Sequence, residues 1–208
     1  MTASGRIHMA RHGRPDIDRS TPMAARDYDA FWAQYQETGL VAGEKPSEDL
    51  AKIAEEAGAL ASSSLRRARE TMAALAGDRG WLIDDVFVEA ALPAPPLPLL
   101  RLSPKIWGAI SRVWWWCGGS HGQESRPEAE IRAQRAGDIL IDLAAEGSDV
   151  LLCGHGWFNR MTGRVLRERG WVCVHDGGDA YWSWRTYAPG AQAIASPGSP
   201  VEALSKTP

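Results

Sequence analysis

Two histidines of this sequence each stand beside a glycine at the end of a short apolar run. His12 lies in Arg11-His12-Gly13 after residues 7–10, and His155 lies in Gly154-His155-Gly156 after residues 150–153. An apolar run of this length, bounded by glycine, is typical of a buried strand. After His155 a helix is expected, and the free N–H groups of its first turn favour an anion. For the first motif alone, an ordinary loop is the competing interpretation.

A third motif supplies further cations. Residues 63–69, SSLRRAR, place Arg66, Arg67 and Arg69 directly after another expected strand. A solvated basic helix face is the competing interpretation for two of these three arginines. Arginine forms bidentate, charge-assisted bonds to phosphate oxygens, and a histidine beside them can act as the nucleophile. Together the three motifs predict a phosphate-binding pocket that contains two imidazoles and at least two guanidiniums.

The composition places the chain among ordinary globular proteins. It has 208 residues, 44% of them hydrophobic and 24% charged, which is enough for a core without disulfide or metal support. The net charge of -3 gives no basic footprint for a nucleic acid. Three separated cysteines without a CxxC pair, an N-terminus rich in Arg and His, and the lack of a long apolar run predict a soluble cytoplasmic protein.

Strands and helices alternate along the sequence. Strands are expected at residues 7–10, 60–63, 81–88, 150–153, 171–174 and 181–187. The aromatic spacing of residues 28–35 predicts an amphipathic helix. Further helices are expected at residues 48–56 after an N-capping Ser47, at 66–75 and 104–116, from a capping box at Ser125 to about 146, and from 156 to Gly170.

This alternation predicts an α/β fold, a three-layer α/β/α sandwich with a mostly parallel central sheet. In such sheets the site lies beyond the carboxyl ends of the strands, so His12 and His155 should meet at one rim although they are far apart in sequence. We expect one domain over residues 1–190. Residues 191–208, rich in Pro, Gly, Ser and Ala, are expected to form a flexible tail.

With these motifs in their order, the chain resembles the histidine phosphatase superfamily, the phosphoglycerate mutase-like proteins. The resemblance covers about residues 5–187 and is carried by MARHG at 9–13, SSLRRARET at 63–71 and CGHG at 153–156. It implies that His12 is the nucleophile that becomes phosphohistidine. It also implies that Arg11, Arg67 and His155 hold the phosphoryl oxygens.

The resemblance also implies a carboxylate that acts as general acid and base. Glu89, after residues 86–88, is the candidate for this role, and Glu124 is the rival. The implied activity is metal-independent hydrolysis of a small phosphomonoester, with no cofactor, because side chains supply the cations. Residues 14–16, Arg-Pro-Asp, depart from the mutase pattern and favour a phosphatase. A phosphomutase and a non-catalytic phosphate-binding or interaction module remain the alternatives.

The segment 107–116 is the most individual part of the sequence. It ends in Trp114, Trp115 and Trp116, and Arg112 interrupts its apolar face. Core packing is the default interpretation for the segment. A lid over the active site, the surface of a homodimer and an interfacial membrane contact are the alternatives. The substrate is not encoded in any motif, because residues 14–45 and 91–123, where specificity should reside, carry none.

Overall fold

Six strands form the central sheet of the computed structural model, which describes residues 5–97, 99–145 and 147–191. Their order across the sheet is β4-β3-β6-β1-β8-β7. The first four are parallel, β8 is antiparallel to β1, and β7 is antiparallel to β8. Their bounds are Ile7–Arg11 (β1), Ala59–Ser62 (β3), Leu82–Ile83 (β4), Val150–Gly154 (β6), Trp171–Asp176 (β7) and Trp184–Pro189 (β8).

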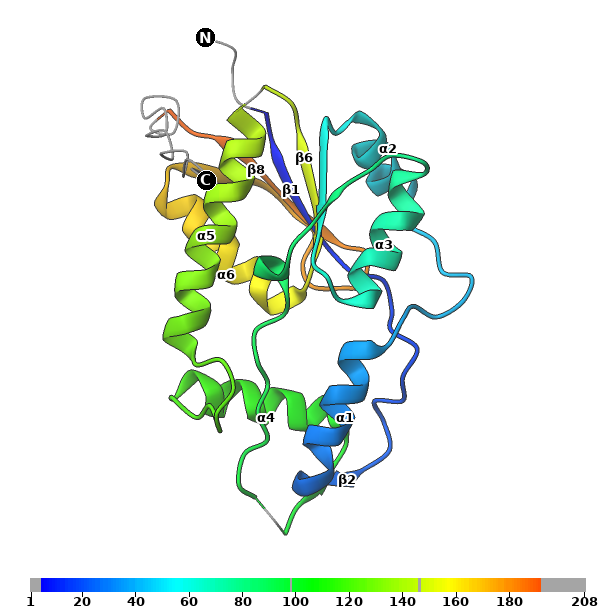
Figure 1. Ribbon diagram of the computed structural model, residues 1–208, viewed down its shortest axis with the longest axis vertical. Helices are drawn as coiled ribbons and strands as arrows, with labels where there is room; N and C mark the ends of the chain where they lie inside the picture. The colour runs from blue at the N-terminus through cyan, green and yellow to red at the C-terminus, as the bar shows by residue number, and fades with distance from the viewer. Residues whose placement is uncertain (1–4, 98, 146, 192–208) are drawn as a thin grey trace, which may run out of the picture.

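Helices cover both faces of this sheet. α5 and α6 pack on one face, and α2 and α3 pack on the other (Figure 1). α1 and α4 lie together beyond the end of the sheet, near a second sheet of two short strands that the sequence did not predict. The bounds are Met23–Ala24 (β2), Ala25–Glu37 (α1), Glu48–Glu56 (α2), Arg66–Ala76 (α3), Arg101–Leu102 (β5), Pro104–Trp116 (α4), Arg126–Ala145 (α5) and Gly156–Glu168 (α6). The predicted α/β/α sandwich is confirmed.

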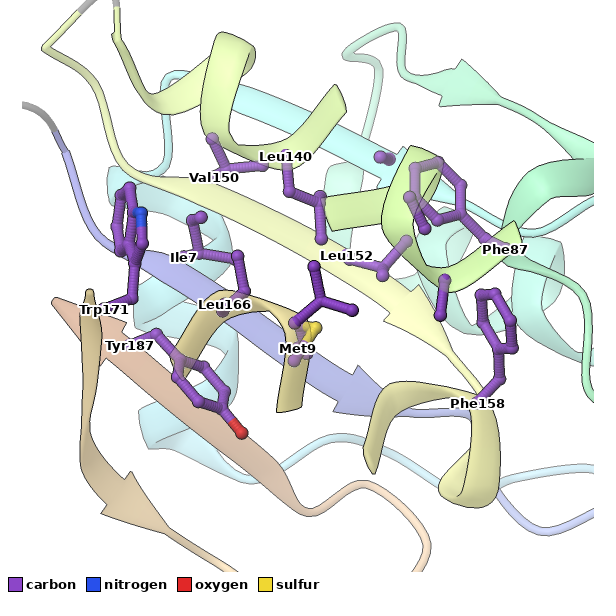
Figure 2. Packing of buried hydrophobic residues seen from close by; sticks show 14 of the residues in the cluster. Ile7, Met9, Phe87, Leu140, Val150, Leu152, Phe158, Leu166, Trp171 and Tyr187 are labelled. Carbon is purple, nitrogen blue, oxygen red and sulfur yellow. The ribbon is translucent and has the colours of Figure 1, made fainter. Parts of the chain in front are cut away.

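Alternating side chains of the central strands fill two separate cores. In β1, Ile7 and Met9 point towards α5 and α6, whereas Ala10 faces α2 and α3. In β6, Leu152 belongs to the first core and Cys153 to the second. Figure 2 shows the first core, where Ile7, Met9 and Leu152 meet side chains of α5 and α6. This alternation fixes the register of both strands and therefore fixes the positions at which they end.

The strand predicted at residues 81–88 is largely wrong. Only Leu82–Ile83 is a strand, and Asp85–Phe87 forms one turn of 3-10 helix (η1). The side chain of Asp84 accepts a hydrogen bond from the backbone N–H of Val86 at 2.8 Å, which starts that turn. Aspartate side chains that bind nearby backbone N–H groups favour turns over strands.

The last predicted strand begins too early in the sequence. β8 starts at Trp184, and residues 177–183 form a loop that returns from β7. In this loop Trp182 has a φ of 64°, and the Ser183 hydroxyl donates to the carbonyl of Ala180 at 2.7 Å. The loop therefore directs Tyr181 and Trp182 out of the sheet. The expected flexible tail lies, from residue 192 on, outside the described residues.

The tryptophan-rich helix α4 buries one face. Trp107 and Trp115 are fully buried, whereas Trp116 keeps 40% of its surface exposed. The Trp107 indole N–H donates to the carbonyl of Met23 at 2.9 Å, and Trp107 belongs to a third core between α1 and α4. Core packing therefore accounts for these two buried indoles. Within the described residues, no helix combines the length and the apolar character needed to cross a membrane.

Gly163 allows α6 to pack closely against β8. A Cβ at this position would overlap the hydroxyl of Tyr187, whereas one at Gly108 in α4 would lie 3.5 Å from the Tyr28 hydroxyl, an ordinary contact. We expect Gly163→Ala to lower the free energy of unfolding by about 1–3 kcal/mol. Gly108→Ala should instead raise it by up to about 1 kcal/mol, because alanine favours the helix. Urea unfolding of both variants checks this, and equal effects would contradict it.

Candidate active site

The two histidine motifs meet because β1 and β6 are parallel neighbours. Arg11 pairs with Gly154 in the ladder, and the backbone N–H of His12 donates to the carbonyl of Gly154 at 3.0 Å. The rings of His12 and His155 consequently lie with their centroids 5.1 Å apart at one rim of the sheet. Both side chains are almost completely buried. The meeting of these two residues was expected from the sequence, and the structure contains it.

His12 is held in one tautomer. Its Nδ1 lies 2.7 Å from the carbonyl oxygen of Gly13, and a carbonyl can only accept, so Nδ1 carries the proton. Nε2 therefore keeps its lone pair, and the Nε–H of Arg67 points at it from 3.3 Å. Gly13 is itself fixed, since its N–H donates to the Thr71 hydroxyl at 2.9 Å. The imidazole thus has an unprotonated Nε2, which accepts a hydrogen bond from the Arg67 guanidinium.

Arg67, in the first turn of α3, is the central cation of the site. It is completely buried, and its Nη1 donates to the carbonyl of Tyr35 at 2.9 Å. Its Nη2 lies 3.4 Å from Nδ1 of His155, and because arginine can only donate, this Nδ1 accepts. His155 then carries its proton on Nε2 and donates it to the Ser63 hydroxyl at 2.6 Å. Two neutral histidines therefore flank one fixed guanidinium.

Arg11 approaches the same rim from the end of β1. Its guanidinium lies 4.3 Å from the centre of the Tyr181 ring, and one of its N–H groups donates to the carbonyl of Asp179. Its Nε is buried and has no hydrogen-bond partner among the described residues. A buried N–H group without a partner costs free energy, which an anionic ligand at this place would recover.

Sequence reasoning missed Arg19 and Tyr181. The ring of Tyr181 lies 5.7 Å from that of His12, and its hydroxyl accepts from Nη1 of Arg19 at 2.9 Å. No carboxylate of the described residues lies within 4 Å of the Arg19 guanidinium. Tyr181 was placed in a strand, and Arg19 stands in a segment without periodicity. Gly177 and Gly178 mark a turn at the start of the loop of residues 177–183, but no local signal shows that this loop brings Tyr181 to Arg19.

The side chain of Glu89 contacts the first turn of α6, the helix that begins directly after His155. Its Oε1 accepts from the backbone N–H of Phe158 at 2.9 Å and of Ala90 at 3.0 Å, and its Oε2 accepts from that of Trp157 at 3.3 Å. A carboxylate has about four lone-pair positions, two on each oxygen. Oε1 uses both of its positions, so Oε2 is the oxygen that keeps one free for a proton.

Glu124, the rival carboxylate, is engaged elsewhere. Its two oxygens accept from Nε and Nη2 of Arg132 at 2.6 and 2.7 Å, and its backbone carbonyl accepts from the indole of Trp115 at 2.8 Å. It does not cap the following helix, because Ser125 and Glu128 form the predicted capping box between themselves. Both carboxylate oxygens of Glu124 are therefore engaged by Arg132.

Burial and neighbouring cations keep both histidines neutral. Loss of solvent lowers the pKa of His12 well below its ordinary 6.5, and the charges of Arg67 and Arg11 lower it further. The pKa of His155 is lowered in the same way, by burial first and then by Arg67. A neutral imidazole is the form that can attack phosphorus.

These two buried histidines should make stability fall in acid. The unfolded chain binds protons to them below about pH 6.5, whereas the folded protein does not. We therefore expect the free energy of unfolding to decrease as the pH falls from 7 to 5, by up to about 1.4 kcal/mol per pH unit for each histidine. The double variant His12→Asn/His155→Asn should lose less stability over this range, by urea unfolding in phosphate-free buffer.

The exposed His121 supplies the control for this measurement. His121→Asn also removes one histidine, but this side chain lies at the surface against the Trp114 ring. The free energy of unfolding of His121→Asn should change with pH as that of the wild type does. An unchanged pH dependence in the double variant would show that His12 and His155 do not carry the effect.

The sequence matches no family model and no curated protein. Solved structures do match. A structure named mycobacterial hydrolase 1 has a TM-score of 0.59 and 20% identity, over 89% of this chain and 89% of that one. Mycobacterial glucosyl-3-phosphoglycerate phosphatase in complex with VO3 gives 0.55 and 22%, over 88% and 92%.

A third match is a phosphoserine phosphatase mutant from Entamoeba histolytica in complex with phosphoserine. It has a TM-score of 0.51 and 16% identity, over 79% of this chain and 80% of that one. The TM-scores of these matches, all above 0.5, show a common fold. The chain accordingly shares its α/β fold with these solved structures, two of which are named as phosphatases.

Proposed function

We propose that this protein hydrolyses small phosphomonoesters through a phosphohistidine on His12. The observation that carries the proposal is the state of this imidazole: Nδ1 donates to the Gly13 carbonyl, so Nε2 is unprotonated and accepts a hydrogen bond from the Arg67 Nε–H at 3.3 Å. The named phosphatases that share the fold, one of them bound to VO3, support a phosphatase over the other activities considered.

In the first step Nε2 of His12 attacks phosphorus and the bond from phosphorus to the leaving oxygen breaks. Glu89, protonated on Oε2, gives its proton to that oxygen as the bond breaks. In the second step water attacks the phosphohistidine, the N–P bond breaks, and Glu89 takes a proton from the water. Inorganic phosphate leaves, and both residues return to their starting states.

The cations of the site stabilise the charge that spreads over the phosphoryl oxygens. Arg67 supplies a fixed positive charge, and Arg11 supplies the unpartnered Nε–H as a donor. His155, whose orientation is set by Ser63, lies beside Nη2 of the Arg67 guanidinium, and His12 lies beside its Nε. Arg19 adds a further guanidinium near His12, held by the Tyr181 hydroxyl. No step requires a metal ion.

The test is to trap the intermediate. The protein is mixed with 32P-labelled 4-nitrophenyl phosphate in the presence of a chelator and quenched in alkali, where phosphohistidine survives. We expect label on His12 by peptide mapping, and more label in Glu89→Gln, since that variant lacks the base for the second step. Turnover without any trapped label would argue against the covalent route, and no turnover or binding would remove the proposed function.

A further inference from the structure

The residues around Glu89 have irregular backbone, and two arginines hold it. Residues 86–91, called here the Glu89 segment, run from η1 into a loop. Nη1 of Arg132, from α5, donates to the carbonyls of Val86 and Val88 at 2.9 and 2.8 Å. Nη1 and Nη2 of Arg112, from α4, donate to those of Ala91 and Ala90 at 3.0 and 3.1 Å. The carbonyl groups on both sides of Glu89 are thus fixed from two helices.

The two arginines differ in how their charge is balanced. Arg132 forms the bidentate pair with Glu124. Arg112 has no carboxylate within 4 Å among the residues that the structure describes. Its guanidinium instead lies between two indoles, 4.9 Å from the ring centre of Trp115 and 5.0 Å from that of Trp157. Aromatic faces attract a cation that has left water.

The indoles of Trp115 and Trp157 form an aromatic cage around the Arg112 guanidinium, and Trp157 connects this cage to the carboxylate of Glu89. Its backbone N–H is the donor to Oε2 of Glu89, while its ring contacts the Arg112 guanidinium. The charges of Arg112 and Glu89 also interact. Burial lowers the pKa of Arg112, and the carboxylate of Glu89 is the strongest influence that raises it again. Arg112 therefore contacts the Glu89 segment through backbone, through an indole and through charge.

We propose that Arg112 is a positioning residue for Glu89. It fixes the backbone that follows the carboxyl group, and with Trp157 it sets the direction in which Oε2 faces the leaving oxygen. This inference rests on the function proposed above, in which Glu89 protonates that oxygen. It also assigns a role to part of the tryptophan-rich helix, since Trp115 forms one wall of the cage.

A residue that acts through the general acid has a distinctive kinetic effect. A good leaving group such as 4-nitrophenolate departs with little help from an acid, whereas phenolate, with a conjugate acid of pKa about 10, needs it. We expect Arg112→Met to lower kcat/KM for phenyl phosphate about 10- to 100-fold more than for 4-nitrophenyl phosphate. A purely structural loss would lower both by the same factor.

The experiment compares wild type, Arg112→Met, Arg112→Lys, Glu89→Gln and the double variant on phenyl phosphates of graded leaving-group pKa. Glu89→Gln should show the steepest dependence on the leaving group. The double variant should be no steeper than Glu89→Gln, because Arg112 acts through Glu89. Arg112→Lys should fall between Arg112→Met and wild type, since it keeps the charge but lacks the rigid planar fork that holds two carbonyls at once.

Arg126→Met is the matched control. The Arg126 guanidinium also lies over an indole, 3.8 Å from the ring centre of Trp116, but it pairs with Glu130 and not with the Glu89 segment. It should leave the dependence on the leaving group as in wild type. Glu89→Gln could show a steep dependence of kcat/KM on the leaving group while Arg112→Met lowers kcat/KM equally for all esters, or for none. This result would overturn the positioning role of Arg112 alone. A wild type that hydrolyses none of the esters would remove the proposed function and this inference with it.

Discussion

Replacing His12 with alanine is expected to reduce turnover of 4-nitrophenyl phosphate by about 10⁴-fold or more, as removal of a nucleophile does in other enzymes. The size of the effect follows from the chemistry. Without Nε2 no covalent intermediate forms. Water would then have to attack the phosphoryl group directly, from the place left by the imidazole. The arginines of the site remain, so inorganic phosphate should still bind to His12→Ala. The measurement is steady-state hydrolysis with a chelator present, together with phosphate binding by calorimetry.

His8→Ala is the control for this variant. His8 lies on β1, four residues before His12, and its ring contacts the Thr186 hydroxyl at 2.9 Å and the Asp149 carboxylate at 3.3 Å. It is a buried histidine at the other end of β1 and has no part in the proposed chemistry. The variant should therefore keep its kcat once its folded fraction is taken into account. Equal activity in His12→Ala and wild type would mean that another group is the nucleophile.

The pairing of the two histidines could be predicted because it depends on short, local patterns. Each stands at the end of an apolar run, and parallel strands end at a common rim. The local pattern also placed three arginines after a third strand, but only the resemblance to a known family singled out Arg67 among them. Nothing in this reasoning needed a long-range contact beyond the sheet itself.

The surroundings of Glu89 could not be predicted in the same way. Glu89 was chosen because the resemblance implies a carboxylate after the third strand, but the end of that expected strand is a 3-10 turn and an irregular segment. Its place is set by Arg112 and Arg132, which lie 23 and 43 residues further along the chain, on helices that the sequence did not connect to it. Side chains that satisfy irregular backbone have no periodicity, and so they leave no pattern to detect.

Arg67 carries the second large effect. We expect Arg67→Met to lower kcat/KM for an aryl phosphate by about 10³-fold or more, because a guanidinium fixed beside the transferred phosphoryl group stabilises its developing charge. Arg67→Lys should lose about 10²- to 10³-fold. Lysine keeps the charge but cannot reach the Tyr35 carbonyl, Gln36 and both histidines with one amine, as the present guanidinium does.

The pH profile separates the two Arg67 variants. The charge of Arg67 is the largest electrostatic cause, after burial, of the lowered pKa of His12. Removing it in Arg67→Met makes protonated His12 less unfavourable, so this pKa rises and the acid limb of kcat/KM should move to higher pH. Arg67→Lys retains a cation, so its limb should stay close to that of wild type. The titration of the substrate itself is common to all three proteins and cancels in the comparison.

The combination of rate and pH effects tests whether Arg67 has both roles. If its charge alone mattered, Arg67→Lys would keep both the rate and the profile. If its fork of hydrogen bonds alone mattered, both variants would lose rate and neither would shift the acid limb. We expect the intermediate pattern, a large loss in both variants and a shift only in Arg67→Met, because the same guanidinium donates to fixed acceptors and holds the nucleophile neutral. Unfolding curves of both variants are needed to normalise the rates, since this side chain is completely buried.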